Sequence, residues 1–222
     1  MDGRSGGPFS APPDRADMDI EPFALERWFA AHEADNLMLA ESGVRPLTPD
    51  RFDLVPEDLG YVVPTGGDPA LRERVGERYD RPGDEVLFAC GTQEANFVTL
   101  AALMGDHAVV VTPTYGSLHA GPGAFGEVTR VDLSAADGWR LDPDAVAEAV
   151  RPDTAVVVLN NPNNPTGRVH TPDAVRAVYE TCADAGTYLL ADEVYRPLVE
   201  GDAPPPVASL GPYGVSTCGL SK

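Results

Sequence analysis

The chain has 222 residues, of which 43% are hydrophobic and 23% are charged, so it is long enough to fold one generous domain with a buried core. A formal net charge of −19 at pH 7 opposes binding to nucleic acids and to anionic membranes. No apolar run approaches the roughly 20 residues of a membrane span, and the N-terminus lacks the basic-then-apolar order of a secretory signal. The three cysteines are far apart and show neither a disulfide framework nor metal-ligand spacing. We therefore expect a cytoplasmic protein that binds no metal, nucleic acid or membrane.

The first 60 residues differ in composition from the rest of the chain. Residues 1–17 are rich in Gly, Pro, Ser and Asp, which predicts a disordered tail. Residues 18–60 form a separate N-terminal segment, in which Pro22 suits the first turn of a helix whose apolar face carries Trp28 and Phe29. The apolar face of that helix must pack against another part of the protein. Residues 61–222 are predicted to form the main domain.

Strands and helices alternate along that domain. A helix is expected to begin at Asp68-Pro69 and to end before Arg81-Pro82-Gly83. The strands are predicted at residues 86–89, 108–112, 128–131, 154–159 and 187–191, and the further helices at residues 94–104, 142–150 and 171–185. Repeated βα units predict an α/β fold with a mostly parallel sheet and helices on both faces.

Polar side chains follow the apolar strands. The run at residues 187–191 ends at Asp192, and Tyr195 follows it. The loop Asn160-Asn161-Pro162-Asn163-Asn164-Pro165 follows the strand at residues 154–159, and Lys222, the only lysine of the chain, ends what we expect to be the next strand. Ligands collect at the carboxyl ends of parallel strands, so an acid and an amine are expected on one edge of the sheet.

Two further positions suit a ligand. Gly91-Thr92-Gln93 lies between a predicted strand and a helix N-terminus, where free backbone N–H groups and the helix dipole attract an anion. It is neither a dinucleotide fingerprint nor a P-loop. Tyr115, which follows Pro113 after a strand, can present an aromatic face.

Three motifs occur in a diagnostic order: Asn164-Pro165-Thr166-Gly167, Asp192-Glu193-Val194-Tyr195 and Ser221-Lys222. Together they resemble the fold type I, class I/II aminotransferases, whose cofactor is pyridoxal 5'-phosphate (PLP). The resemblance implies that residues 61–222 are the PLP-binding large domain of that fold. It also implies transfer of an amino group from an amino acid to a 2-oxo acid, by an enzyme that is a homodimer in its full-length form.

The resemblance assigns roles to individual residues. Lys222 would form an imine with the cofactor aldehyde and later move the proton at the substrate α-carbon. Asp192 would keep the pyridine nitrogen protonated, so that the ring accepts electrons better. Tyr195 and Asn164 would hydrogen-bond the phenolic oxygen of the cofactor, and Tyr115 would lie against its ring.

The remaining implied contacts concern the cofactor phosphate and the substrate. Gly91, Thr92 and Gln93 would bind the phosphate at the helix N-terminus. Tyr61 resembles a tyrosine that reaches the phosphate of the neighbouring subunit, and Gly43 resembles a glycine near the substrate carboxylate. Gly219 occupies the position where many members carry a phosphate-binding serine, which predicts weaker binding of the cofactor phosphate.

Members of the family continue well past the lysine, through a strand that joins the sheet and a C-terminal domain with the substrate-binding arginine. We therefore expect a truncated large domain that is inactive or impaired as it stands. Three alternatives remain open. One is another PLP reaction, a lyase or an amino-acid cyclase, since the N-terminal segment distantly resembles the capreomycidine synthase branch. The others are a non-catalytic remnant and a nucleotide-binding α/β module, which would require a glycine fingerprint that we do not find.

Overall fold

The computed structural model describes residues 20–39, 43, 47–51, 66–201 and 203–222. Over these residues the chain forms one five-stranded sheet, in the order β2-β1-β3-β4-β5, in which every neighbouring pair is parallel. The strands are β1 (His107–Thr112), β2 (Glu127–Asp132), β3 (Thr154–Asn160), β4 (Tyr188–Asp192) and β5 (Gly214–Thr217). The α-helices are α1 (Ala24–His32), α2 (Pro69–Tyr79), α3 (Thr92–Leu103), α4 (Gly116–Gly123), α5 (Pro143–Ala149) and α6 (Pro172–Ala185).

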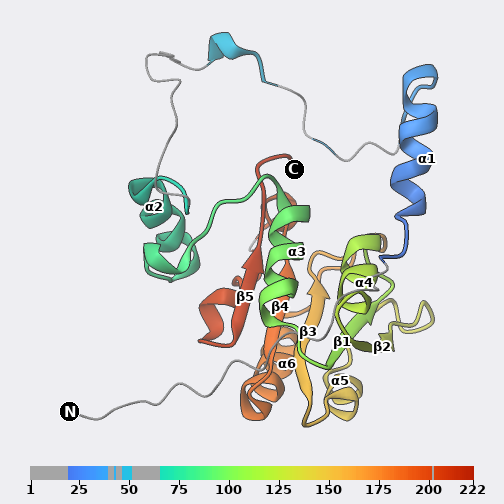
Figure 1. The fold of residues 1–222 in the computed structure, drawn as a ribbon, viewed down its shortest axis with the longest axis vertical. Coiled ribbons are helices and arrows are strands. Elements are labelled where there is room, and N and C mark those ends of the chain that lie inside the picture. The colour runs from blue at the N-terminus through green and yellow to red at the C-terminus, as the bar shows by residue number, and fades with distance from the viewer. Residues whose placement is uncertain (1–19, 40–42, 44–46, 52–65, 202) are drawn as a thin grey trace.

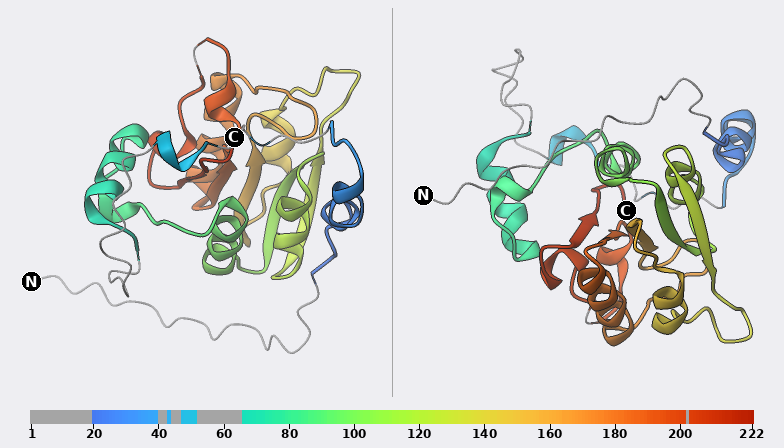
Figure 2. Two further views of the ribbon diagram at one scale, coloured as in Figure 1. Left: turned by 90° about the horizontal axis from the view of Figure 1, so that it is seen from above. Right: turned by 60° about the horizontal axis from the view of Figure 1, so that its bottom comes forward.

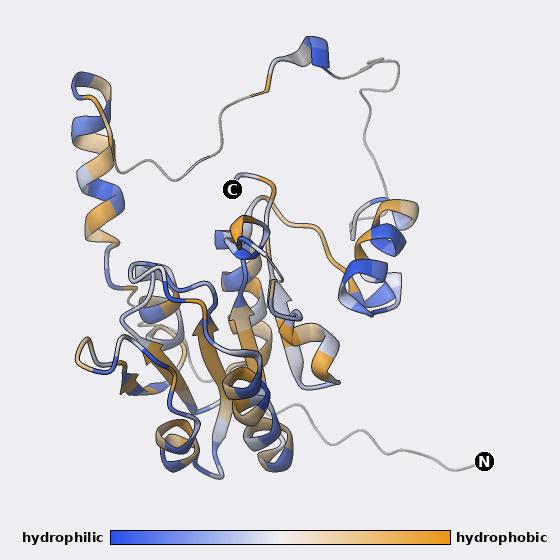
Figure 3. Ribbon diagram, turned by 180° about the vertical axis from the view of Figure 1, so that it is seen from behind, coloured by the Kyte–Doolittle hydropathy of each residue, from blue (hydrophilic) through white to orange (hydrophobic). Residues whose placement is uncertain are grey.

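Helices cover both faces of the sheet, as the sequence predicts (Figure 1). Val109 and Val111 of β1 face a core shared with α5 and α6, whereas Val110 between them faces α3 and α4. The central strands β1, β3 and β4 are almost wholly buried, and Figure 3 shows the hydrophobic residues gathered on them. A strand buried on both faces needs apolar side chains in succession, which is why these strands are continuous apolar runs.

Short polar signals set the helix ends. Asp68, Asp142 and Thr171 precede α2, α5 and α6, and each accepts a hydrogen bond at its side chain from a backbone N–H of the first turn. A proline follows each of them, where its missing N–H costs nothing. Gly186 ends α6 with φ +69°, a conformation that glycine adopts without strain.

Two predicted strand positions are wrong. Residues 86–89 form no strand, because no neighbouring strand of the described chain accepts their hydrogen bonds; Leu87 is 76% exposed. Strand β5 ends at Thr217, so Lys222 follows it at the end of a five-residue loop rather than at the strand end itself. In both cases the extent of a strand depends on which chain segments lie beside it, and local sequence does not specify that.

The N-terminal helix α1 and the helix α2 lie on opposite sides of the sheet and its covering helices (Figure 2). Helix α1 starts at Ala24, two residues after Pro22, so Pro22 precedes the helix instead of lying in its first turn as predicted. None of the residues of α1 is buried. The predicted tail at residues 1–17 lies outside the described residues. Within the described ranges, no helix has the length and apolar character needed to cross a membrane.

Candidate active site

The ends of three neighbouring strands meet at one level of the sheet. In the strand register Asn160 pairs with Asp192, and Asp192 pairs with Thr217, so the last residues of β3, β4 and β5 lie side by side. The strand order reverses between β1 and β3, because β2 and β3 lie on opposite sides of β1. The carboxyl ends of strands at such a reversal are where α/β sheets bind ligands.

A cavity of about 460 Å³ lies at this edge. It is lined by Leu25, Glu26, Phe29, Thr92, Gln93, Asn96, Tyr115, Asn160, Asn164, Asp192, Val194, Tyr195, Ser221 and Lys222. Seven of the eight site residues expected from the sequence are among them. The eighth, Gly91, lies directly before α3 as its N-cap. The size of the cavity falls within the range of pockets that hold small ligands.

Asp192 lies at the buried end of the cavity, with 4% of its surface exposed. Its Oδ2 accepts a hydrogen bond from Asn96 Nδ2 at 2.8 Å, and its Oδ1 accepts one from the Val194 backbone N–H at 3.1 Å. Burial raises the pKa of Asp192 above its ordinary value, and these two hydrogen bonds oppose the rise. The carboxylate is thus oriented by two donors and is poorly solvated, which favours a cationic partner.

The loop after β3 is held by its own amides. Asn160 Oδ1 accepts a hydrogen bond from the Asn164 backbone N–H at 2.6 Å, and Asn160 Nδ2 donates to the Asp192 carbonyl at 2.9 Å. These contacts tie the loop to the neighbouring strand. They direct the Asn164 side chain toward the cavity, where its Nδ2 lies 3.5 Å from the Tyr195 hydroxyl. Donors from two strand ends therefore face the same space.

The N-terminus of α3 faces the cavity through Thr92 and Gln93. Gly91 has φ +89° and ψ 167°, a backbone conformation that is nearly restricted to glycine. Gly219 lies close to this turn, since a Cβ on Gly219 would be 2.9 Å from Thr92 Oγ1. The segment before Lys222 therefore passes directly over the helix N-terminus, and Figure 1 shows the C-terminus beside the start of α3.

The residue next to Asp192 faces a different environment. Glu193 is buried with 2% exposure, and its Oε1 accepts a hydrogen bond from the Val207 backbone N–H at 2.7 Å. Burial raises the pKa of Glu193 to about 7, against the opposing effect of that N–H. Glu193 thus holds the loop after β4 and does not line the cavity.

Tyr115 and α1 close another side of the cavity. The Tyr115 hydroxyl donates a hydrogen bond to Glu26 Oε1. Burial and this hydrogen bond raise the pKa of Tyr115, so the phenol stays protonated and remains a donor. Leu25, Glu26 and Phe29 of α1 supply the wall. Helix α1 thus contacts the site through Glu26 and Tyr115. The packing of residues 18–60 on a small domain and a partner subunit stays a prediction.

Sequence reasoning did not identify Asn96 or Glu26, whose side chains bond to predicted site residues. Asn96 follows Thr92 by four residues, so both lie on one face of α3, and that spacing could have identified it. Besides its bond to Asp192, Asn96 accepts a hydrogen bond at Oδ1 from the Thr217 hydroxyl at 2.7 Å. No sequence pattern could have identified Glu26, because only the tertiary structure brings α1 to Tyr115. Gly43 is not among the residues that line the cavity, and Tyr61 lies outside the described residues.

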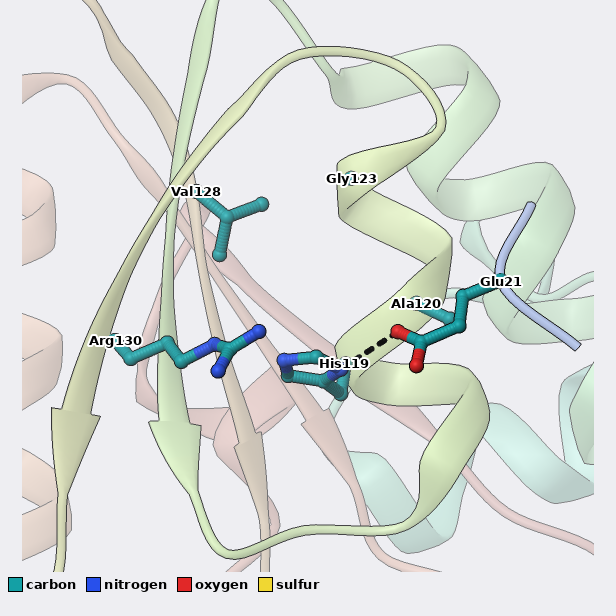
Figure 4. A pocket seen from close by; sticks show the side chains of 6 residues that line it. All are labelled: Glu21, His119, Ala120, Gly123, Val128 and Arg130. Atoms are coloured by element: carbon teal, nitrogen blue, oxygen red, sulfur yellow. Dashed lines mark ion pairs between the residues drawn. The ribbon is translucent and has the colours of Figure 1, made fainter. Parts of the chain in front are cut away.

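A second cavity, of about 540 Å³, lies between α4 and the edge strand β2. Figure 4 shows the Arg130 and His119 side chains turned toward one another across it, with Glu21 reaching His119 from the segment before α1. Glu21 Oε2 lies 4.0 Å from His119 Nδ1. This cavity contains none of the predicted site residues, and the contact of Glu21 with His119 brings the N-terminal segment to it.

Comparison with known proteins agrees with this geometry. Residues 56–222 match the family model described as aminotransferase class I and II. The chain is similar to an aspartate aminotransferase of Geobacillus stearothermophilus, with 29% identity over 64% of this chain and 38% of that protein. It is also similar to nicotianamine aminotransferase B of Hordeum vulgare, with 35% identity over 77% of this chain and 31% of that protein.

Solved structures show the same relationship. A PLP-dependent aminotransferase from Streptococcus suis has a TM-score of 0.79 and 28% identity, over 90% of this chain and 58% of that one. The aspartate aminotransferase of Thermus thermophilus with maleate has a TM-score of 0.68 and 29% identity, over 72% of this chain and 44% of that one. The chain spans about two fifths of the length of the first of these curated relatives. By the match over residues 56–222, the chain belongs to the class I and II aminotransferases, a membership that implies pyridoxal phosphate as its cofactor.

Proposed function

We propose that the cavity between the strand ends and α1 binds PLP and serves the transfer of an amino group between an amino acid and a 2-oxo acid. The observation that carries this proposal is that Asp192 and Lys222, thirty residues apart in the sequence, line one cavity. A carboxylate and an amine on one small cavity suit a ring that carries a basic nitrogen and an aldehyde.

The side chains present fit this cofactor. A buried carboxylate at Asp192 favours a protonated ring nitrogen, because an unpaired charge at 4% exposure needs an opposite charge nearby. Thr92 and Gln93 begin α3, where free backbone N–H groups suit a phosphate. Tyr195 and Asn164 offer donors between these two ends. When bound, PLP supplies an aldehyde that links to an amine and a ring that withdraws electrons from the substrate α-carbon.

Each residue then has one task. Asp192, oriented by Asn96 and Val194, holds a proton at the ring nitrogen. Lys222 would hold the cofactor through its amine and would move the proton at the substrate α-carbon. Tyr195 and Asn164 donate to the ring oxygen. Helix α1 presents apolar surface to one side of the cavity through Leu25 and Phe29.

The partners of the whole protein belong to this proposal as well. Exposed apolar side chains on α2, on α3 and between them support a homodimer: Leu71, Leu87, Phe88, Phe97 and Val98. Such residues suit an interface rather than a free surface. Analytical ultracentrifugation of the chain over a concentration series tests whether these residues form an interface by themselves, and a monomer at every concentration would contradict that role. Cytoplasmic location stays a prediction from the cysteine content.

A half-reaction tests the amino transfer. The chain is loaded with PLP, mixed with an amino acid in the absence of any 2-oxo acid, and analysed by chromatography for pyridoxamine phosphate and the matching 2-oxo acid. Amino transfer produces both in equal amounts. A lyase or a cyclase would consume the amino acid without aminating the cofactor, and a non-catalytic remnant would leave both unchanged.

A further inference from the structure

Helix α1 brings a carboxylate to the mouth of the cavity. Leu25, Glu26 and Phe29 line the wall, and Leu25 and Phe29 are four residues apart, so they share the helix face next to Glu26. The Glu26 carboxylate uses Oε1 to accept the hydrogen bond from Tyr115. Its Oε2 accepts none from any residue that the structure describes. One carboxylate oxygen is thus held in place, and the other is available to a ligand.

Polar contacts set the position of α1. Leu25 is 57% exposed and Trp28 is 51% exposed, so apolar burial alone does not hold the helix. Glu21 reaches the cavity beside His119 and Arg130 just before the helix begins (Figure 4), and Glu26 meets Tyr115 from the first turn of the helix. Two carboxylates, one before the helix and one in its first turn, therefore hold this face of α1 toward the site.

The charges that line the cavity are unevenly distributed. Among the described residues that line it, the acids are Glu26 and Asp192, the only cation is Lys222, and no arginine is present. Asp192 is buried beside Asn96, whereas Glu26 is exposed at the opening. A carboxylate at the entrance attracts cationic ligands and repels anionic ones, and its field adds to that of a chain with net charge −19.

We infer that Glu26 is a specificity-determining residue that selects amino acids with a cationic side chain, namely a methylene chain ending in a guanidinium or ammonium group. Leu25 and Phe29 provide the apolar surface for the methylene groups, and Glu26 Oε2 accepts from the cationic end. Dicarboxylate substrates are disfavoured because a second carboxylate would face Glu26. This inference rests on the proposed function, since it assigns the substrate class of the same cavity.

The test compares L-arginine with L-citrulline, which has nearly the same shape without the charge, and with L-glutamate. Calorimetric titration measures the binding of each to the chain, with and without PLP. L-arginine should bind more tightly than L-citrulline by up to about fivefold, the upper end of the ratio expected for one partly exposed ion pair. L-glutamate should bind more weakly than both. In Glu26→Gln the ratio of arginine to citrulline affinity should fall to about one.

Glu33→Gln is the matched control, because Glu33 is an exposed acid of the same segment that does not line the cavity. It removes the same charge from the chain and should keep the wild-type ratio. Equal affinities of the wild-type chain for arginine and citrulline, no binding of either, or an equal loss of the ratio in both variants would overturn the inference. The visible absorbance of bound PLP reports the proposed function separately: a loaded chain without charge preference contradicts only the role of Glu26, and a charge preference without cofactor binding contradicts only the cofactor site.

Discussion

Asn96 Nδ2 donates a hydrogen bond to Asp192 Oδ2 at 2.8 Å, with both side chains at least 96% buried. The Thr217 hydroxyl donates to Asn96 Oδ1 at 2.7 Å, which turns the amide so that its N–H faces the carboxylate. Residues from α3, β4 and β5 thereby fix one carboxylate in one orientation. Such a group costs free energy to bury, and its hydrogen bonds recover part of that cost.

Asn96→Leu should raise the pKa of Asp192 further, because it removes one of the two donors that oppose burial. A hydrogen bond to a charged group is worth about 1.5–3 kcal/mol, so the effect should be large. The carboxyl carbon resonance of Asp192, followed by NMR against pH in the cofactor-free chain, measures it. Thr217→Val keeps the Asn96 donor and should cause a smaller rise. An unchanged titration of Asp192 in Asn96→Leu would show that the contact does not set its ionisation.

Lys222→Arg should abolish covalent attachment of PLP. Arginine keeps the positive charge, but its guanidinium does not form the imine. The wild-type chain loaded with PLP and reduced with borohydride should carry the cofactor on its single lysine, and peptide mass spectrometry locates the modification. The variant should carry none on its C-terminal peptide. Modification that persists at the N-terminal amine alone in both proteins would contradict the assignment of Lys222.

Gly91→Ala should destabilise the turn before α3 and weaken phosphate binding. At φ +89° and ψ 167° a side chain is strained at a cost of about 1–3 kcal/mol, although no neighbouring atom lies within 4 Å of the new Cβ. Gly123→Ala is the matched control, since a Cβ there also meets no atom within 4 Å and the helical backbone suits alanine. Urea unfolding and titration with inorganic phosphate compare the two. Equal losses in both variants would argue against backbone strain at Gly91.

Glu193 should make the stability of the chain depend on pH. Burial raises the pKa of Glu193 from 4.5, its value in an unfolded chain, to about 7 in the folded chain. The stability that this shift provides is therefore fully present below a pH of about 4.5 and is lost as the pH rises through about 7. The loss amounts to about 3 kcal/mol. Glu193→Gln should lack this pH dependence. Between pH 4.5 and about 7, the free energy of unfolding of the wild type should therefore fall relative to that of the variant. Urea unfolding at several pH values measures both.

The control for that experiment is Glu148→Gln on the exposed face of α5. This variant also loses one carboxylate, but it should follow the wild type at every pH. Parallel curves for Glu193→Gln and the wild type would show that Glu193 does not titrate in this range.

Local signals in the sequence predicted most of the described elements. Thr171-Pro172 and Gly186 bound α6 where expected, because a side-chain cap and a residue at positive φ act within one turn of the chain. The predicted strand at residues 86–89 failed for a different reason. Its residues have the apolar character of a strand, but a strand also needs a neighbour, and none of the described strands lies beside it.

The sequence by itself determined which segments become the buried strands, where the helices end and which residue types follow the strands, because apolar periodicity and capping depend on neighbours in the chain. Only the tertiary structure decided that Asn96 orients Asp192, that Lys222 reaches the cavity from a loop beyond β5, and that Glu26 meets Tyr115. These relationships join residues up to 96 positions apart. They follow from sheet order and helix packing, which no short stretch of sequence encodes.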